Sequence, residues 1–143
     1  MIRQAEPEDL PAVLALLVDA ELPTDGVADH FGSFFVVDEG GRIVGSVGLE
    51  WHGDAALLRS LAVAPQARGT GLGGAILRRA LHEAHGRADG VYALTTTAEP
   101  YLARFGFEPV SRASLPPALF ESRELKGACP VSATAMKWIG RFR

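Results

Sequence analysis

A glycine-rich turn at residues 66–74, which reads Gln-Ala-Arg-Gly-Thr-Gly-Leu-Gly-Gly, has the composition of a phosphate-binding loop. The apolar, strand-like run from Ala56 to Ala64 precedes it, and apolar residues recur at three- and four-residue spacing from Ile76 to Ala84. Glycines let the backbone come close to a ligand, and the free N–H groups of a first helical turn point at an anion. The order of strand, turn and helix therefore predicts a phosphate-binding site.

Two other interpretations of this turn are open. Gly69 to Gly74 also fits the dinucleotide pattern G-x-G-x-x-G, but that pattern belongs to repeated strand-helix-strand units of a parallel sheet. Here three strands that look antiparallel come first, and the next strand ends in Thr95-Thr-Thr97 with no acidic residue for a ribose. The remaining interpretation is a purely structural glycine-rich turn.

Candidates for acid–base chemistry and substrate recognition lie on neighbouring predicted strands. Glu50, at the end of a strand beside the central one, is the first candidate for a base; the alternative is a solvated strand-end carboxylate. One of Arg59 and Ser60 must face the functional side of the sheet, where a guanidinium suits a substrate carboxylate. Thr95 and Thr96 add hydroxyls to the same pocket, or serve only as strand formers.

The four histidines and the one cysteine are weaker candidates. His30 and His52 lie in predicted loops near the substrate end, whereas His82 and His85 lie on the polar side of the long helix. Their spacing relative to the carboxylates is not that of metal ligands, so no metal is predicted. Cys129 precedes a proline and lies far in the sequence from any base, so we expect a small hydrophobe and no covalent intermediate on its thiol.

The elements that position these residues follow from hydrophobic periodicity and turn residues. Strands are expected at residues 1–4, 34–39, 42–50, 56–64, 91–96, 107–112 and 130–138, and helices from Glu6, from about Leu72 and over 99–105. Gly40-Gly41 supplies the positive φ angles of a hairpin turn. Residues 27–33 form a short helix or a loop, and residues 113–128 are irregular, with one helical turn near Pro117 to Glu121.

The composition of the 143-residue chain predicts a single domain, residues 1–143, because 48% of the residues are apolar and 22% are charged. The net charge of −3 argues against a general nucleic-acid binder. The first ten residues do not read as a signal peptide, and the longest apolar run, Ala12 to Val18, is too short to span a membrane. With one cysteine, a reducing, cytoplasmic location is expected.

The motif Gln66-x-x-Gly69-x-Gly71, after the Leu61-Ala-Val63 strand and before Ala103-Arg-Phe-Gly-Phe107, resembles the acyl-CoA-binding signature of the GNAT N-acetyltransferase superfamily. The order of elements agrees with that fold over nearly the whole chain. The resemblance implies an α/β (α+β) fold, with a mixed, mostly antiparallel central sheet of about seven strands, helices on both faces and a splayed central strand pair.

The same resemblance implies that acetyl-CoA is the cofactor. Backbone N–H groups from Gln66 to Gly71 would bind its pyrophosphate, beside the charge of Arg68 and the positive end of the following helix. Leu61 and Val63 would hydrogen-bond the pantetheine arm, and a backbone N–H near Leu61 or Ala62 would stabilise the oxyanion. The residues implied in cofactor binding are Leu61, Ala62, Val63, Gln66, Ala67, Arg68, Gly69, Thr70, Gly71, Leu72, Gly73 and Arg104.

The family's usual catalytic tyrosine lies four residues before the glycine of the Gly-Phe pair, and that position holds Leu102 here. Tyr101 is adjacent, but one step along a helix turns a side chain by about 100°. Tyr101 is therefore either the acid that protonates the leaving thiolate or an aromatic that packs in the core or against the cofactor.

Two finer likenesses concern the acceptor. Leu94-Thr-Thr-Thr, followed by Tyr101-Leu-Ala-Arg-Phe-Gly-Phe107, is similar to the acetyltransferase domain of N-acetylglutamate synthases. Leu57-Leu-Arg-Ser-Leu-Ala-Val63, Thr95-Thr-Thr-Ala-Glu99 and Cys129-Pro-Val-Ser-Ala133 resemble a small bacterial group associated with arsenic-resistance operons. Both likenesses imply an amino-acid-like acceptor, either glutamate-like or an arsenical amino acid.

The predicted function is an acetyl-CoA-dependent N-acetyltransferase that acts on a small amine bearing a carboxylate, by direct transfer in a ternary complex. Two rivals remain open. One is an acetyltransferase of a protein or polyamine amine, and the other is a non-catalytic acyl-CoA sensor, which Leu102 at the tyrosine position would allow. The apolar C-terminal strand with Trp138 and Ile139 would serve either a homodimer interface or the core.

Overall fold

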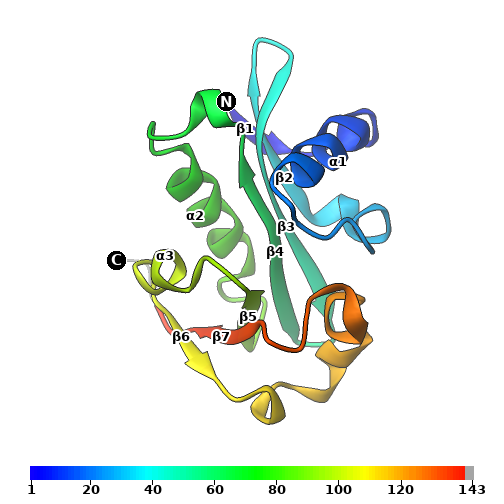
Figure 1. The fold of residues 1–143 in the computed structure, drawn as a ribbon, viewed down its shortest axis with the longest axis vertical. Coiled ribbons are helices and arrows are strands. Elements are labelled where there is room, and N and C mark those ends of the chain that lie inside the picture. Colours follow the sequence, from blue (N-terminus) through cyan, green and yellow to red (C-terminus); the bar gives the residue numbers. More distant parts are fainter. Residues whose placement is uncertain (141–143) are drawn as a thin grey trace.

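The fold is organised around one seven-stranded sheet, and the computed structural model describes residues 1–140 of the chain (Figure 1). The strands are β1 (Ile2–Gln4), β2 (Phe34–Glu39), β3 (Arg42–His52), β4 (Ala55–Val63), β5 (Gly90–Thr95), β6 (Phe107–Val110) and β7 (Thr134–Trp138). The helices are α1 (Leu10–Asp19), α2 (Leu72–Ala84) and α3 (Glu99–Ala103). Short helical turns lie at Pro7–Asp9, Ala28–Ser33, Pro65–Ala67, Arg112–Ser114, Pro117–Glu121 and Glu124–Ala128.

The strand order is β1-β2-β3-β4-β5-β7-β6, and only the β4–β5 pair is parallel among the described residues. This confirms the expected mixed, mostly antiparallel sheet. Gly40 and Gly41, with φ angles of 62° and 89°, turn the β2–β3 hairpin as predicted. β7 is paired on both edges and its Met136 is fully buried, so this strand contributes to the core, whereas Trp138 is half-buried and Ile139, just after the strand, is 53% exposed.

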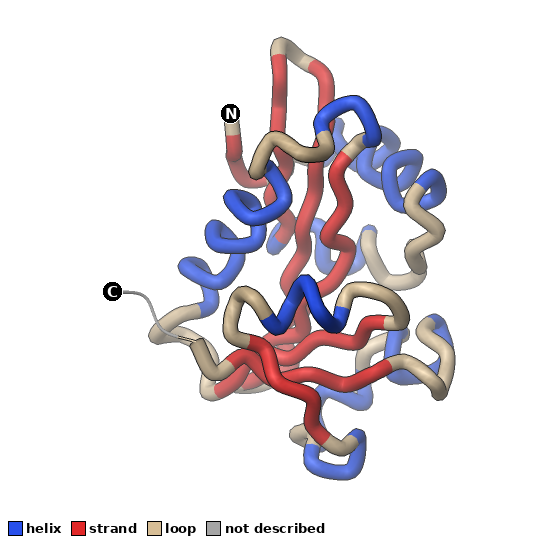
Figure 2. The backbone as a smooth tube through the Cα atoms, turned by 60° about the vertical axis from the view of Figure 1, so that its left-hand side comes forward, coloured by secondary structure: helices blue, strands red, loops and turns tan. Residues whose placement is uncertain are grey.

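Helices cover both faces of the sheet, as expected. α1 and α2 lie on opposite sides of the β1–β4 strands (Figure 1). Each buries one apolar stripe, which includes Val13 and Leu17 on α1 and Ile76 and Leu77 on α2. α3 lies in front of the β5, β7 and β6 strands in Figure 2. Within residues 1–140, the helices lack the length and apolar character that crossing a membrane requires.

β4 and β5 separate part-way along their length. Their parallel register ends at Leu58 and Ala93, whereas β4 continues to Val63 beside β3. Ser60 has a left-handed φ of 60°, opposite a register shift between Ser46 and Gly48. An irregularity of this kind bends a strand. The predicted splay is therefore present, and β4 residues 61–63 pair with no strand on the β5 side.

Several element boundaries differ from the predictions. β6 ends at Val110 rather than at residue 112, where a 3-10 turn begins, and α3 ends at Ala103 rather than at residue 105. α1 begins at Leu10 rather than Glu6, because a 3-10 turn with a capping box between Glu6 and Asp9 precedes it. β3 extends to His52, so Glu50 lies inside the strand. The last strand begins at Thr134 rather than at residue 130, because the preceding residues form a turn.

The two segments that were hardest to interpret from the sequence are built of short helical turns. The predicted helical turn at Pro117–Glu121 is present, and it is followed by a π-helical turn at Glu124–Ala128. Residues 28–33 form a 3-10 helix, which settles the choice between helix and loop. Both segments lie beside the strands that carry the candidate site.

Candidate active site

A cavity of about 630 Å³, the loop cavity, lies between the end of β4, the glycine-rich turn and α3. Most of the predicted cofactor-binding residues line it: Leu61, Ala62, Val63, Ala67, Arg68, Gly69, Gly71, Leu72, Gly73 and Arg104. Gln66 and Thr70 do not line it. Thr70 instead closes the turn by donating its hydroxyl to the Ala67 carbonyl at 2.6 Å.

Backbone forms the wall of the loop cavity at the start of α2. Gly69 and Gly71 adopt left-handed φ angles of 79° and 82°, which favour glycine. No side chain caps the helix at Gly71, so the N–H groups of the first turn remain for an anion. Gly73 packs closely against this wall, because a Cβ there would lie 3.0 Å from the Tyr101 hydroxyl oxygen and would force the ring to shift slightly.

Three arginines border the loop cavity. Arg68 donates its Nε to the Val63 carbonyl at 3.1 Å. The guanidinium carbons of Arg78 and Arg104 lie 5.1 and 5.8 Å from aromatic ring centroids, those of Phe105 and Tyr101 respectively. Their charges add to the positive end of the α2 dipole, so this cavity favours anions.

A second cavity of about 680 Å³, the gap cavity, begins where β4 and β5 separate. It shares Leu61, Ala62 and Val63 with the loop cavity. The residues predicted to bind substrate, Arg59, Ser60, Thr95 and Thr96, all line it. A ligand that lies along β4 residues 61–63 can therefore reach both cavities.

Arg59 and Glu50 form a buried ion pair between β4 and β3. Nη1 of Arg59 lies 2.6 Å from Oε2 of Glu50. Arg59 also donates to the carbonyls of Pro23 and Asp25 and to the Ser60 hydroxyl. These four bonds leave at most one of the five guanidinium N–H groups for a substrate carboxylate.

Glu50 is fully buried, so the alternative of a solvated strand-end carboxylate is wrong. Burial opposes its ionisation, but hydrogen bonds from His52, Arg59 and Ser122 outweigh burial and hold the pKa of the carboxyl below its ordinary value. Glu50 lines neither cavity. Its assignment as the base stays a prediction, and its absence from both cavity walls does not favour it.

Two histidines join Glu50 in a cluster that their sequence spacing did not indicate. Oε1 of Glu50 lies 2.8 Å from Nε2 of His52 and 3.6 Å from Nε2 of His30, and the three atoms lie within 4.8 Å of one another. Such a set could hold a metal ion, although none was predicted. Arg59 binds the other carboxylate oxygen, and its positive charge opposes a dication, so we interpret the cluster as a hydrogen-bond network.

The sequence matches the family model described as an acetyltransferase (GNAT) domain over residues 30–109, which is more than half of the chain. The chain belongs to the GNAT acetyltransferase family. A comparison with curated protein sequences gave no match.

Solved structures share the fold of this GNAT domain. N-acetylglutamate synthase from Neisseria gonorrhoeae, complexed with coenzyme A and N-acetyl-glutamate, has a TM-score of 0.82 at 24% identity, over 99% of this chain and 35% of that one. Rv2747 from Mycobacterium tuberculosis, in complex with CoA and NLQ, has a TM-score of 0.80 at 21% identity, over 99% of both chains. The chain thus spans about a third of the length of the synthase.

A third structure, a GNAT-family acetyltransferase from Staphylococcus aureus Mu50, has a TM-score of 0.78 at 15% identity, over 96% of this chain and 97% of that one. At these identities the likenesses establish the fold. They agree with the resemblance to N-acetylglutamate synthases at the level of fold, and the link to arsenic resistance stays a hypothesis.

The GNAT fold places Tyr101 and Leu102 in different surroundings. Leu102, at the usual tyrosine position, is 4% exposed and lines the gap cavity. Tyr101 lines the loop cavity, with its ring centroid 5.1 Å from that of Phe105. This separation follows from the rotation between successive helical residues. A catalytic role for Tyr101 stays a prediction.

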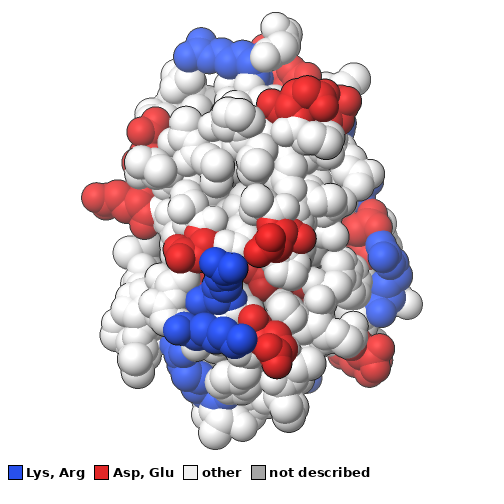
Figure 3. All heavy atoms as spheres, turned by 90° about the vertical axis from the view of Figure 1, so that its right-hand side faces the viewer, with Lys and Arg blue, Asp and Glu red and all other residues white. Residues whose placement is uncertain are grey.

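Sequence reasoning missed the buried carboxylate of the gap cavity, Glu124, which is 4% exposed. Its neighbours Arg123 and Lys126 are exposed. Nη2 of Arg123 lies 3.9 Å from Oδ2 of Asp29, and Nζ of Lys126 lies 3.3 Å from Oε2 of Glu121. Charges of both signs therefore mix on this outer surface (Figure 3). Neither a motif nor a periodic pattern marks Glu124, because the segment that carries it is neither a strand nor a long helix. Cys129, expected as a small hydrophobe, is also buried and lines the same cavity.

Proposed function

We propose that this GNAT domain transfers an acetyl group from acetyl-CoA to the amine of a small acceptor, by direct attack within a ternary complex. One observation carries the proposal: the loop cavity and the gap cavity meet at β4 residues 61–63, on the edge that β5 leaves unpaired. A thioester held along this edge and an amine in the gap cavity would come together there.

The residues of the loop cavity fit the parts of CoA. The backbone of the glycine-rich turn and the first turn of α2 suits a pyrophosphate. Arg68, Arg78 and Arg104 supply positive charge. The unpaired edge at Leu61 to Val63 suits an extended pantetheine arm, and Arg68 would release the Val63 carbonyl to that arm. A backbone N–H at Leu61 or Ala62 would stabilise the oxyanion.

Direct transfer is favoured because the thiol of the gap cavity is a poor nucleophile. Burial, together with the negative charge of Glu124, raises the pKa of the Cys129 thiol to about 12. At neutral pH the group therefore stays protonated, and the thiolate is the reactive form. In the transfer, the amine nitrogen bonds to the acetyl carbonyl carbon, the thioester C–S bond breaks, and CoA leaves as a thiol.

We further propose that the acceptor is amino-acid-like, with glutamate-like and arsenical amino acids as the classes to test. Support comes from the likeness in fold to a synthase solved with N-acetyl-glutamate, and from the size of the gap cavity, about 680 Å³, which suits a small molecule. Among the groups that the cavity offers to the acceptor's carboxylate are the exposed Thr96 and Thr97, the guanidinium of Arg68 and at most one N–H of Arg59. The Thr95 hydroxyl oxygen already accepts the N–H groups of Thr97 and Ala98.

The test is release of free CoA thiol from acetyl-CoA with amino acids, arsenical amino acids, peptides and polyamines as acceptors. Turnover confined to the amino-acid group supports the full proposal. Turnover with peptides or polyamines alone would overturn the acceptor class, and tight acetyl-CoA binding without turnover would favour the sensor alternative.

A matched pair of variants tests the cofactor site. Arg68→Ala is expected to raise the KM for acetyl-CoA about tenfold, which corresponds to the loss of one charge-assisted contact. Arg42→Ala removes an exposed arginine from the β2–β3 hairpin and should leave this KM unchanged. Equal effects of the two substitutions would argue against the proposed cofactor position.

A further inference from the structure

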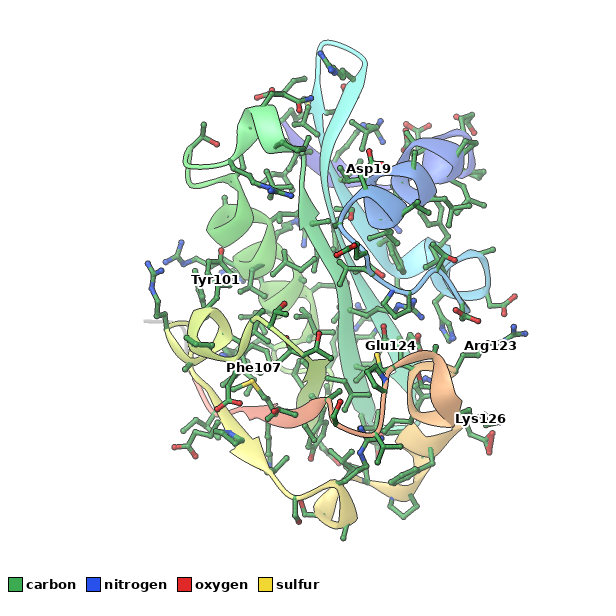
Figure 4. The ribbon with its side chains drawn as sticks, in the orientation of Figure 1. Asp19, Tyr101, Phe107, Arg123, Glu124 and Lys126 are labelled. Carbon is green, nitrogen blue, oxygen red and sulfur yellow. The ribbon has the colours of Figure 1, made fainter. Side chains whose placement is uncertain are left out.

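Glu124 presents a buried carboxyl group to the gap cavity. Its side chain is 5% exposed and lies 3.5 Å from Nε of Arg59. In Figure 4, Glu124 lies on the side of its loop that faces β4, whereas Arg123 and Lys126 point away. The same cavity wall includes Leu61 and Ala62, the residues whose backbone N–H groups are candidates for the oxyanion site. The carboxyl group therefore lies in the cavity where the amine is expected.

Short-range hydrogen bonds hold Glu124 in this position. Its N–H donates to the Ser122 hydroxyl oxygen at 3.2 Å, and its carbonyl accepts the N–H of Cys129 at 3.1 Å. Gly127, with a φ of 125°, lets the chain turn back between these two points. The backbone of the turn is thus fixed on both sides of the carboxyl group.

The surroundings of Glu124 favour its neutral form far more than those of Glu50 do. Burial raises the pKa of Glu124 to about 7, the charge of Glu50 adds to this effect, and Arg59 and the Cys129 thiol oppose it. Glu50 faces Glu124 from β3, Arg59 faces it from β4, and Cys129 belongs to the chain just after the turn. Glu50, by contrast, has a lowered pKa and two oxygens engaged by His52 and Arg59. A base with a pKa near the working pH takes a proton more effectively than a strongly ionised carboxylate.

Resting on the proposed acetyl transfer, we infer that Glu124 is the general base that takes a proton from the ammonium group of the acceptor. The carboxylate removes one proton from the ammonium, and the free amine nitrogen then attacks the acetyl carbonyl carbon. As the C–S bond breaks, the sulfur takes the second proton that the nitrogen loses, and Glu124 returns its own proton to solvent. The sum is amide, CoA thiol and one released proton.

The kinetic test compares Glu124→Gln with Glu121→Gln, an identical change at an exposed position three residues earlier, which lines neither cavity. We expect Glu124→Gln to lower kcat/KM for the acceptor by roughly 10²- to 10³-fold and to leave acetyl-CoA binding unchanged. The step of the pH profile near pH 7 should disappear with it, which leaves only the rise that the acceptor's own ammonium group sets at higher pH. Glu121→Gln should keep both the rate and the step.

A conservative variant separates a base from a structural residue. Glu124→Asp keeps a carboxylate at a changed distance, so it should retain this step with a reduced rate. If Glu124→Gln and Glu124→Asp lose activity equally and neither changes the shape of the pH profile, Glu124 is not the base.

Titration of the group itself decides the question independently of any acceptor. In protein with ¹³C-labelled glutamate side chains, one carboxyl signal should titrate near neutral pH, and Glu124→Gln should remove it while Glu121→Gln does not. Absence of that signal overturns the inference. Its presence in a protein that binds acetyl-CoA but acetylates no acceptor would instead count against the proposed function alone.

Discussion

Nη1 of Arg59 lies 2.6 Å from Oε2 of Glu50, and this buried pair joins β4 to β3 just beyond the point where β4 parts from β5. The same guanidinium binds the carbonyls of Pro23 and Asp25, which belong to a segment that lines the gap cavity. One side chain therefore ties a wall of the cavity to the sheet. Arg59 acts first as a structural anchor.

Arg59→Met is expected to destabilise the fold by about 3–5 kcal/mol, because it leaves the Glu50 carboxylate buried without its cationic partner. Glu50→Gln should also be destabilising, since the buried guanidinium then lacks a counter-charge. The double variant should cost clearly less than the sum of the two single changes. Urea unfolding of the four proteins measures this coupling, and strict additivity would contradict the pairing.

The sequence singled out both members of this pair but not their contact. Alternation along β4 indicated only that Arg59 or Ser60 faces the functional side, because the irregularity at Ser60 interrupts the regular alternation. The pairing also depends on a β3–β4 register across nine residues of chain. Residue patterns within either strand did not indicate the register shift between Ser46 and Gly48, which alters the pairing beside Arg59.

Other parts of the fold could be predicted because their signals are local. The Gly40-Gly41 hairpin, the strand before the glycine-rich turn and the apolar face of α2 each depend on residues within about one element's length. Glu124 gave no such signal. It lies in a segment of short turns whose position is fixed by contacts with Arg59 and Ser122, and these contacts exist only after folding.

The free energy of unfolding should depend on pH because of Glu124. Its pKa rises from 4.5 to about 7 on folding, so the folded protein binds this proton more tightly than the unfolded chain does. Stability from this group is therefore full below about pH 4.5 and falls by about 3 kcal/mol as the pH rises to about 7. Glu124→Gln should remove that fall.

The pH dependence of the free energy of unfolding must be compared between wild type and Glu124→Gln, because Glu50 changes this free energy with pH in the opposite direction. Its lowered pKa contributes stability above its ordinary pKa, which is lost as the pH falls. Chemical denaturation of wild type and Glu124→Gln from pH 4.5 to 8 isolates Glu124. A pH-independent difference between them would show that the pKa of Glu124 is not raised.

Gly71 should be needed for both backbone conformation and cofactor binding. Its φ is 82°, so Gly71→Ala is expected to cost about 1–2 kcal/mol of stability and to weaken acetyl-CoA binding. Gly86, just after α2, has the same φ of 82° and equally open surroundings, but lies outside the loop cavity. Gly86→Ala should therefore cost similar stability and leave binding unchanged. Calorimetric titration of both variants with CoA makes the distinction, and equal losses of affinity would refute a local role for Gly71.

Tyr101→Phe is expected to change kcat by less than about threefold, because Tyr101 lines the loop cavity beside Gly73 while Leu102 lines the gap cavity. Loss of a true general acid would lower kcat on the order of 10²–10⁴-fold. Tyr101→Ala removes the whole ring and should mainly raise the KM for acetyl-CoA, since the ring forms part of the wall near Phe105 and Arg104. Steady-state kinetics of the two variants separates the roles. A large fall in kcat at constant KM in Tyr101→Phe would instead make its hydroxyl the proton donor to the leaving thiolate.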